Sequence, residues 1–162
     1  MKRPPALCII GHQNSGKTRV VAALVKHLTR RGYRVGTLKH ATHGFLADTP
    51  GKDSHAHFNA GAAMTMLSSP DKVAVFRRVP REKRLADLLS AFDGVDLVLI
   101  EGYRRCALPK IEVYRRAVAP KPMSLTHRLR VAATVSDDLA GAIPTSRVKA
   151  LADAVLRALD IN

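Results

Sequence analysis

One short segment constrains the fold of this chain more than any other part of it. The segment reads Gly11-His12-Gln13-Asn14-Ser15-Gly16-Lys17-Thr18, which is the complete pattern G-x-x-x-x-G-K-[ST]. An apolar run from Ala6 to Ile10 precedes it, and a helix-patterned segment follows it. A strand, a glycine-flanked loop and a helix in this order predict a phosphate-binding loop. The alternative is a glycine-rich turn that holds no ligand.

The spacing within this loop suits the recognition of a nucleotide. Backbone N–H groups of the loop can wrap around a phosphate, and the positive end of the following helix dipole points to the same place. Lys17 is then expected to reach the β- and γ-phosphates, and Thr18 to offer its hydroxyl to Mg²⁺. Nucleotide contacts are predicted from Gly11, His12, Gln13, Asn14, Ser15, Gly16, Lys17, Thr18 and Arg19.

Length and composition place the chain among globular proteins. Its 162 residues can bury a substantial core in one domain, residues 1–162, without a metal or a disulfide. Cys8 falls in the first predicted strand and Cys106 in a distant loop, so a disulfide framework is not expected and the reducing cytoplasm is the expected location. The apolar run after Arg3 is too short for a signal peptide, and no stretch is long enough to span a membrane.

The net charge of +14 favours an anionic partner. Nucleotides, nucleic acids and phosphorylated metabolites all qualify. The 27 Lys and Arg residues are dispersed along the chain, however, and the absence of Trp leaves few aromatic side chains for base stacking. We therefore expect a charged surface with one phosphate-binding site, and not nucleic-acid binding as the main role.

Hydrophobic periodicity divides the chain into alternating strands and helices. Helices are predicted over residues 17–31, 53–59, 85–92 and 146–159, and strands over residues 6–10, 34–39, 63–67, 73–77, 96–101, 110–114 and 129–135. The strands at 63–67 and 73–77 flank a turn and predict a hairpin, and the polar residues 40–60 are a candidate functional loop. The expected fold class is α/β: a P-loop NTPase three-layer domain with a mostly parallel sheet and a hairpin insertion.

A second nucleotide element is predicted at the end of an apolar strand, where Glu101 precedes Gly102. In a P-loop fold such a strand lies beside the first one, so Glu101 is expected near the Mg²⁺ or the water bound to it, as a metal-side and catalytic residue. Asp96 is the rival acid, but it lies at the other end of the strand, away from the carboxyl ends where ligands collect. A strand that ends in a solvated Glu is the alternative.

Six short strings resemble a known family when they are taken in order. They are Gly11 to Thr18, Thr37-Leu38-Lys39-His40 with His43, Asp48 to Ser54, Ala60-Gly61-Ala62, Glu101-Gly102-Tyr103 and Pro109 to Val113. Together they resemble the molybdopterin-guanine dinucleotide biosynthesis protein B family over residues 8–116, and the C-terminal third is similar in outline. The resemblance implies a cytoplasmic GTP-binding homodimer with slow GTPase activity. Such proteins act as adapters for the enzyme that joins GMP to molybdopterin.

Two positions depart from what the resemblance implies. Related dimeric NTPases often carry a second lysine early in the loop, where this chain has His12. The loop therefore does not support an intersubunit lysine finger. Tyr103 stands where Phe is more usual after Glu-Gly, a change that keeps an aromatic ring.

Histidines and acids gather in the polar loop and the predicted helix after it. The histidines are His40, His43, His55 and His57. Their spacing does not match a standard structural zinc site, and no cysteine is near them in sequence. The preferred interpretation is a rim of the γ-phosphate site, or a surface for a phosphorylated pterin, built from Lys39, His40, Lys52 and Asp53. In this hypothesis Asp53 orients the attacking water as a further catalytic residue.

The usual guanine-reading string Asn-Lys-x-Asp is missing. The predicted strand at 129–135 instead runs into Ser136-Asp137-Asp138. One carboxylate can accept both the N1–H and the N2–H₂ of guanine, so Asp137 is the predicted base reader. A pair of acids in a polar loop is the alternative, and only the family resemblance favours GTP over ATP.

The leading functional hypothesis is a GTP-binding adapter of molybdenum cofactor assembly that uses GTP and Mg²⁺ and hydrolyses GTP slowly. The alternative is a small-molecule P-loop kinase, with Arg104-Arg105 and Arg115-Arg116 as phosphate clamps. No arginine-rich lid insertion is recognisable for that alternative. A basic nucleic-acid-binding module is the third class, and its affinity would fall steeply with salt.

Overall fold

The computed structural model describes residues 3–42, 44–46 and 48–161. Its elements are β1 (Ala6–Ile10), α1 (Lys17–Arg30), β2 (Val35–Lys39), α2 (Asp53–Asn59), β3 (Met64–Ser68), β4 (Val73–Arg77), α3 (Leu85–Leu89), β5 (Leu97–Glu101), β6 (Lys110–Val113), α4 (Met123–His127), β7 (Ala133–Val135) and α5 (Val148–Ala158). The chain forms two compact units. The sheet unit comprises Met1–His40 and Ala86–Asn162, and the hairpin unit comprises Ala41–Leu85. A single domain over residues 1–162 stays a prediction.

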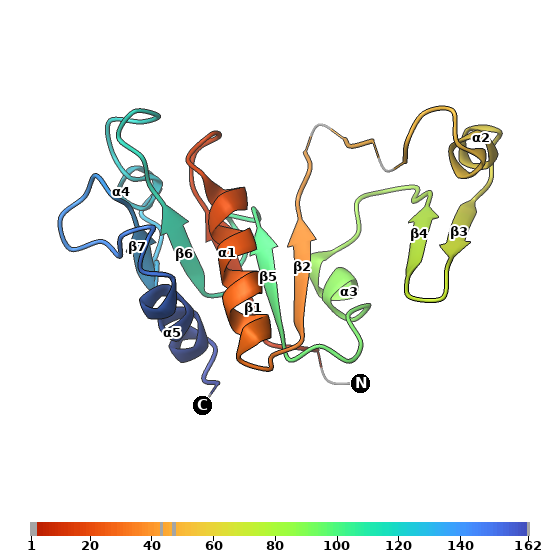
Figure 1. The fold of residues 1–162 in the computed structure, drawn as a ribbon. Helices are drawn as coiled ribbons and strands as arrows, with labels where there is room; N and C mark the ends of the chain where they lie inside the picture. Colours follow the sequence, from red (N-terminus) through yellow and green to blue (C-terminus); the bar gives the residue numbers. More distant parts are fainter. Residues whose placement is uncertain (1–2, 43, 47, 162) are drawn as a thin grey trace. The chain divides into compact units, whose positions relative to one another are not determined.

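The sheet unit is built on five parallel strands in the order β2-β5-β1-β6-β7 (Figure 1). β1 lies at the centre and pairs with β5 from Ala6↔Val98 to Ile9↔Glu101, and with β6 on its other side. This arrangement confirms the predicted α/β class with its parallel sheet, and it places β5 beside β1. The P-loop, residues 11–18, therefore leaves the sheet at the edge where Glu101 ends β5.

Helices cover one face of this sheet, and shorter segments cover the other. Because strand residues alternate between faces, one face presents Leu7, Ile9, Leu97, Leu99, Ile111, Val113 and Val135 to α1 and α5. Figure 1 shows α1 and α5 in front of the sheet. On the opposite face the Phe92 ring packs over Gly36, where a Cβ atom would meet the ring at 2.7 Å. Gly36 is thus needed for close packing.

The hairpin unit contains α2, β3 and β4 in the predicted places. β3 and β4 are antiparallel, with pairs from Met64↔Arg77 to Ser68↔Val73. The Phe58 ring of α2 meets Phe76 edge-on at 6.4 Å, and the Arg78 guanidinium lies 4.3 Å above the Phe58 ring. These contacts attach α2 to the hairpin.

Two predictions about the C-terminal half were wrong in detail. The strand expected over 129–135 is only Ala133–Val135, and a short helix, α4, forms at Met123–His127, where no helix is predicted. The helix is explained by Glu112 of β6, whose buried carboxylate accepts hydrogen bonds from the N–H groups of Met123 and Ser124 and so caps α4. In the described residues, no helix has the length and apolar character to cross a membrane.

Candidate functional site

The P-loop joins β1 to α1 at the carboxyl edge of the sheet. Gly11 has φ +146°, and a Cβ atom there would lie 2.3 Å from the Val113 carbonyl oxygen, so only glycine fits. Gly16 precedes α1 with φ +98°, and it gives the helix no side-chain cap. The first turn of α1 contains no acidic residue. Its backbone N–H groups are therefore available to an anion, as the sequence predicts.

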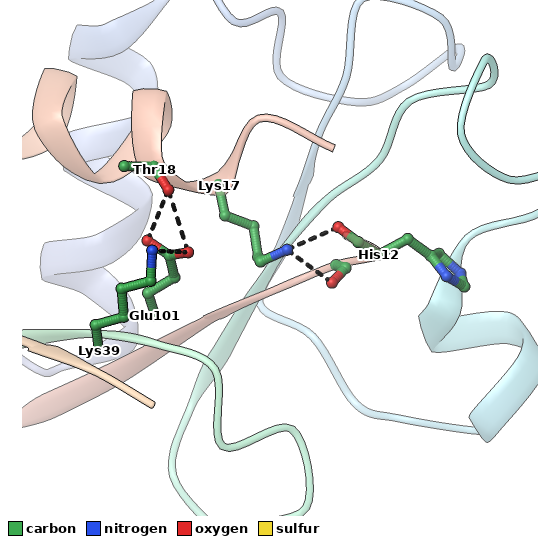
Figure 2. Close-up of polar contacts among 6 residues, drawn as sticks. His12, Lys17, Thr18, Lys39 and Glu101 are labelled. Carbon is green, nitrogen blue, oxygen red and sulfur yellow. Dashed lines mark hydrogen bonds and ion pairs between the residues drawn. The ribbon is translucent and has the colours of Figure 1, made fainter. Parts of the chain in front are cut away.

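Lys17 lies folded back over the loop. Its Nζ donates to the carbonyl oxygens of Gly11 at 3.1 Å and His12 at 2.7 Å (Figure 2). The pKa of Lys17 is lowered, mainly by burial and also by the charge of Lys39, whereas Glu101 opposes the shift. The ammonium group is thus partly stripped of water, and a phosphate would be a stronger partner than the two carbonyls.

Thr18 and Glu101 meet directly beside Lys17. The Thr18 hydroxyl donates to the Glu101 carboxylate, with Oγ1 3.0 Å from Oε2 and 3.2 Å from Oε1. Lys39 comes from the end of β2, and its Nζ lies 3.6 Å from Glu101 Oε1 (Figure 2). The register places Lys39 opposite Glu101 and Glu101 opposite Ile9, so three neighbouring strands converge here. The predicted proximity of Glu101 to the P-loop is confirmed.

This pair of oxygen ligands suits a magnesium ion. A hydroxyl and a carboxylate are hard donors, and Mg²⁺ in nucleotide sites usually takes one or two protein ligands with phosphate and water as the rest. Among the residues that the structure describes, no three His, Cys, Asp or Glu side chains form a cluster that would hold a metal on their own. A magnesium site at Thr18 and Glu101 would therefore depend on a bound phosphate.

The segment after Glu101 is held against the end of β2. The His40 N–H donates to the Glu101 carbonyl at 3.0 Å, and the His40 ring stacks on Tyr103 with 4.2 Å between centroids. A Cβ atom at Gly102 would lie 3.0 Å from His40 Cβ, so glycine permits this approach. His40 therefore supports the Glu101 side of the site, through ring stacking and one backbone bond.

A cavity of about 590 Å³ opens on the other side of the P-loop. It is lined by Asn14, Ser15, Gly16, Arg19, Val20, Ala23, Val113, Tyr114, Arg115, Asp137, Asp138, Thr145, Val148 and Leu151. Its volume is in the range of small-molecule sites. Because the P-loop forms one wall, a nucleotide with its phosphates at α1 can place its nucleoside here. Arg19 and Asp137, both predicted to contact the nucleotide, lie in this lining.

Asp137 already has partners in this cavity. Its Oδ1 accepts from the Thr145 N–H at 2.8 Å and its Oδ2 from the Thr145 hydroxyl at 2.6 Å, and these bonds lower the pKa of Asp137. Asp138 Oδ2 accepts from the Arg116 N–H at 2.9 Å, and its carbonyl accepts from the Arg116 guanidinium at 3.0 Å. Both acids therefore brace the cavity wall, and each oxygen keeps a further lone pair for a ligand.

Other predicted residues belong to the hairpin unit or are not described. Lys52 and Asp53, at the start of α2, belong to the hairpin unit, and so do His55 and His57. The Asn59 side-chain nitrogen lies 3.1 Å from His55 Nε2. His43 lies outside the described residues. The role of Asp53 in orienting water stays a prediction.

Sequence reasoning missed two buried charged residues, Lys110 and Glu112. They alternate with Ile111 and Val113 in β6 and so share one face of a strand that is buried throughout. Lys110 Nζ donates to the carbonyl oxygens of Cys106 and Leu108 at 2.5 and 2.8 Å. The signal was present in the sequence: charges at alternate positions of a short apolar strand indicate inward-facing polar groups.

Comparison with known proteins yields one family. The family model of molybdopterin guanine dinucleotide synthesis protein B matches residues 6–137. The molybdopterin-guanine dinucleotide biosynthesis adapter protein of Escherichia coli (strain K12) is 34% identical over 137 residues, which cover 82% of this chain and 78% of that protein. The Haemophilus influenzae protein of the same name is 35% identical over 121 residues, with 74% and 67% covered.

Solved structures agree with this result. The crystal structure of molybdopterin-guanine biosynthesis protein B is similar with a TM-score of 0.74 at 26% identity, and the match covers 96% of this chain and 99% of the other. Bacillus subtilis MobB is similar with a TM-score of 0.70 at 26% identity, covering 96% and 98%.

Proposed function

The chain belongs to the molybdopterin guanine dinucleotide synthesis protein B family, and from that premise we propose that it is a GTP-binding adapter of molybdopterin guanine dinucleotide biosynthesis that hydrolyses GTP slowly. The observation that carries the proposal is the meeting of Thr18 and Glu101 beside Lys17. Their hydroxyl, carboxylate and ammonium groups converge at the N-terminus of α1, which is the arrangement that phosphoryl-transfer sites of P-loop proteins require.

Each group then has a defined task. The N–H groups of the first turn of α1 bind the phosphates, and Lys17 moves from the Gly11 and His12 carbonyls to the β- and γ-phosphates. Thr18 and Glu101 would hold Mg²⁺, which neutralises charge on the phosphates when it is bound. The Glu101 side chain is 14% exposed, so water can reach its carboxylate. In this proposal the carboxylate accepts a hydrogen bond from water on the γ-phosphate side.

Lys39 is the further cation in this proposal. Lys39 ends β2, which lies beside β5 on the side away from β1. Its Nζ lies 3.6 Å from Glu101 Oε1. From there it faces the terminal phosphate, where negative charge gathers during transfer. His12 occupies the position of the second loop lysine found in related NTPases, and Lys39 supplies a cation from the same chain.

The nucleoside part of GTP occupies the cavity between the P-loop and α5. Asp137 offers the remaining lone pairs of its carboxylate to guanine N1–H and N2–H₂, and Thr145 holds that carboxylate in place. For the kinase alternative, Arg116 is engaged by Asp138 through both its N–H and its guanidinium, and Arg115 is the member of that pair that lines the cavity.

A homodimer is the proposed assembly. Four apolar side chains share one face of the hairpin and are exposed: Met64 44%, Met66 58%, Val73 60% and Val75 48%. Met66 lies opposite Val75, and the same face also carries Arg77 opposite Met64 and Ser68 opposite Val73. A two-stranded sheet is only marginally stable by itself, and its edges can pair with further strands. A second copy would cover this face. The remaining partners, from the family resemblance, are molybdopterin and the enzyme that joins GMP to it, in the cytoplasm.

Isothermal titration with GTP, ATP and Mg²⁺ tests this function. Wild-type protein should bind GTP more tightly than ATP, and Mg²⁺ should strengthen GTP binding. In the Thr18→Ala variant, Mg²⁺ dependence should fall more than the affinity measured without Mg²⁺. A search for copurifying pterin and an affinity measurement against the purified synthesis enzyme test the adapter role. A wild-type protein that binds neither nucleotide would overturn the proposal.

A further inference from the structure

The two cysteines of this chain lie side by side although 98 residues separate them in sequence. Cys8 is on β1, the strand that leads into the P-loop, and Cys106 is in the loop between β5 and β6. Their sulfur atoms are 3.1 Å apart, and both thiols are free. A disulfide bond is about 2.05 Å long, so closure would bring the two sulfur atoms only about 1 Å nearer.

The backbone around the pair is fixed by hydrogen bonds. The Cys8 N–H donates to the Pro109 carbonyl at 2.9 Å, and the Cys106 N–H donates to the Tyr103 carbonyl at 3.0 Å. Lys110 Nζ donates to the Cys106 carbonyl at 2.5 Å. The strand and the loop therefore hold both cysteines in position, and the short sulfur–sulfur distance does not depend on side-chain rotation alone.

The two thiols differ in access to solvent. Cys8 is fully buried, whereas Cys106 is partly exposed. Burial, reinforced by the neighbouring Cys106 thiol, raises the pKa of Cys8 well above its ordinary range. A dissolved reagent thus meets Cys106 first, and Cys8 is protected from direct attack.

We propose that Cys8 and Cys106 form a reversible intramolecular disulfide, with low-molecular-weight disulfides of the glutathione class as the oxidant. In the first step the Cys106 thiolate attacks one sulfur of the oxidant, whose S–S bond breaks and releases one thiol. In the second step Cys8 Sγ attacks Cys106 Sγ, the mixed S–S bond breaks, and the Cys8 proton passes to the departing thiolate, which leaves as the second small thiol. Two electrons pass from the cysteines to the oxidant, and two equivalents of the small thiol are formed.

The bond would tie two parts of the candidate site together. The loop that carries Cys106 begins directly after Glu101, and its first residues, Gly102 and Tyr103, contact His40. A covalent link from this loop to β1 restricts the loop relative to the strand that precedes the P-loop. In the oxidised protein, the backbone of residues 102–106 should therefore unfold locally less often.

Mass spectrometry of the full chain tests the proposal. Reduced protein is incubated with oxidised glutathione, quenched with acid, denatured and treated with iodoacetamide. The mass of wild-type protein should fall by two hydrogens, and neither cysteine should be alkylated. Digestion should yield one peptide pair linked through Cys8 and Cys106, and dithiothreitol should restore both thiols. A wild-type protein that keeps both thiols, or that stops with glutathione attached, would overturn the proposal.

Two variants test the order of events. Cys106→Ser, at a partly exposed position, should leave Cys8 unmodified under the same native conditions. Cys8→Ala should stop with one glutathionyl group on Cys106. If Cys106→Ser is modified at Cys8 as fast as wild type, Cys106 is not the entry point and the proposed order is wrong. Hydrogen exchange of amides 102–106 should slow several-fold on oxidation of wild type, and unchanged exchange would refute the link between loop and strand.

Discussion

The Thr18 hydroxyl donates to both carboxylate oxygens of Glu101, with Oγ1 at 3.0 and 3.2 Å from them. Thr18 is in the first turn of α1 and Glu101 ends β5, so this contact joins the helix after the P-loop to the strand beside it. These two groups would be the protein ligands of a Mg²⁺ ion, in place of their direct hydrogen bond. This relationship makes Glu101 the first acid to test.

Replacement of Glu101 by Gln should separate hydrolysis from binding. The amide keeps the size of the side chain but loses the charge that orients water, so GTP hydrolysis should fall at least about tenfold while GTP affinity changes little. Turnover and calorimetry on the same preparation measure both. Asp96→Asn is the matched control. Asp96 directly precedes β5, at the end of the strand opposite to Glu101, and it pairs with Arg34 at 2.9 Å. The Asp96→Asn variant should hydrolyse GTP as wild type does. If Glu101→Gln has wild-type turnover, another acid has the role, with Asp53 the next to test.

Lys39 should contribute to turnover more than to affinity. In the proposed site its charge faces the terminal phosphate, where it matters most in the transition state, so Lys39→Ala should lower kcat by about tenfold or more. Lys39→Arg should retain part of the activity because it keeps the positive charge. Lys26→Ala removes an exposed lysine of the same unit and serves as the control. Equal losses in GTP affinity and kcat, or no loss, would contradict this placement.

The sequence predicted the part of the site that depends on local patterns. The glycine spacing of the P-loop, the apolar strand before it and the amphipathic helix after it are all encoded within residues 6–30, and the structure confirms them. The position of Glu101 could also be predicted, because parallel strands bring their carboxyl ends to one edge. Both inferences depend on short-range order alone: the sequence of strand, loop and helix, and the edge at which parallel strands end.

The remaining parts depend on contacts between distant residues. α4 begins where the Glu112 carboxylate accepts from the Met123 and Ser124 N–H groups, and nothing in the residues of α4 themselves signals this cap. The partner of Asp137 is Thr145, across a loop that no periodic pattern describes. The approach of Cys8 to Cys106 depends on the pairing of Cys8 with Lys110 of β6 and on the bond from Lys110 Nζ to the Cys106 carbonyl, which cannot be read from either cysteine alone.

Asp137 should affect the choice of base. Loss of hydrogen bonds to a charged acceptor is worth about 1.5 to 3 kcal/mol, so Asp137→Ala should cut the preference for GTP over ATP roughly 10- to 100-fold. Thr145→Val removes one bond to the carboxylate but leaves the carboxylate in place, so it should cost less of the preference. Competitive titration of both nucleotides measures the ratio. A preference that survives in Asp137→Ala and vanishes in Asp138→Ala would assign the role to Asp138.

The apolar face of the hairpin should hold the dimer together. Met66 and Val75 are cross-strand partners on this face, and a lysine at either position would place a charge in the proposed interface. Sedimentation should therefore show a shift from dimer to monomer in Met66→Lys and Val75→Lys. Ala74→Lys adds the same charge on the other face of the same strand and should remain dimeric. A wild-type protein that sediments as a monomer at micromolar concentration, with and without nucleotide, would refute the dimer.

Calorimetric titration of GTP with Mg²⁺ into wild type and Lys17→Ala tests nucleotide binding by the P-loop most directly. Lys17 lies over the loop with its Nζ 2.7 Å from the His12 carbonyl, and it is the partly buried cation that a phosphate would engage. Its removal should weaken GTP binding by about tenfold or more, with circular dichroism and melting temperature close to wild type. Unchanged GTP affinity in a folded Lys17→Ala protein would contradict the account.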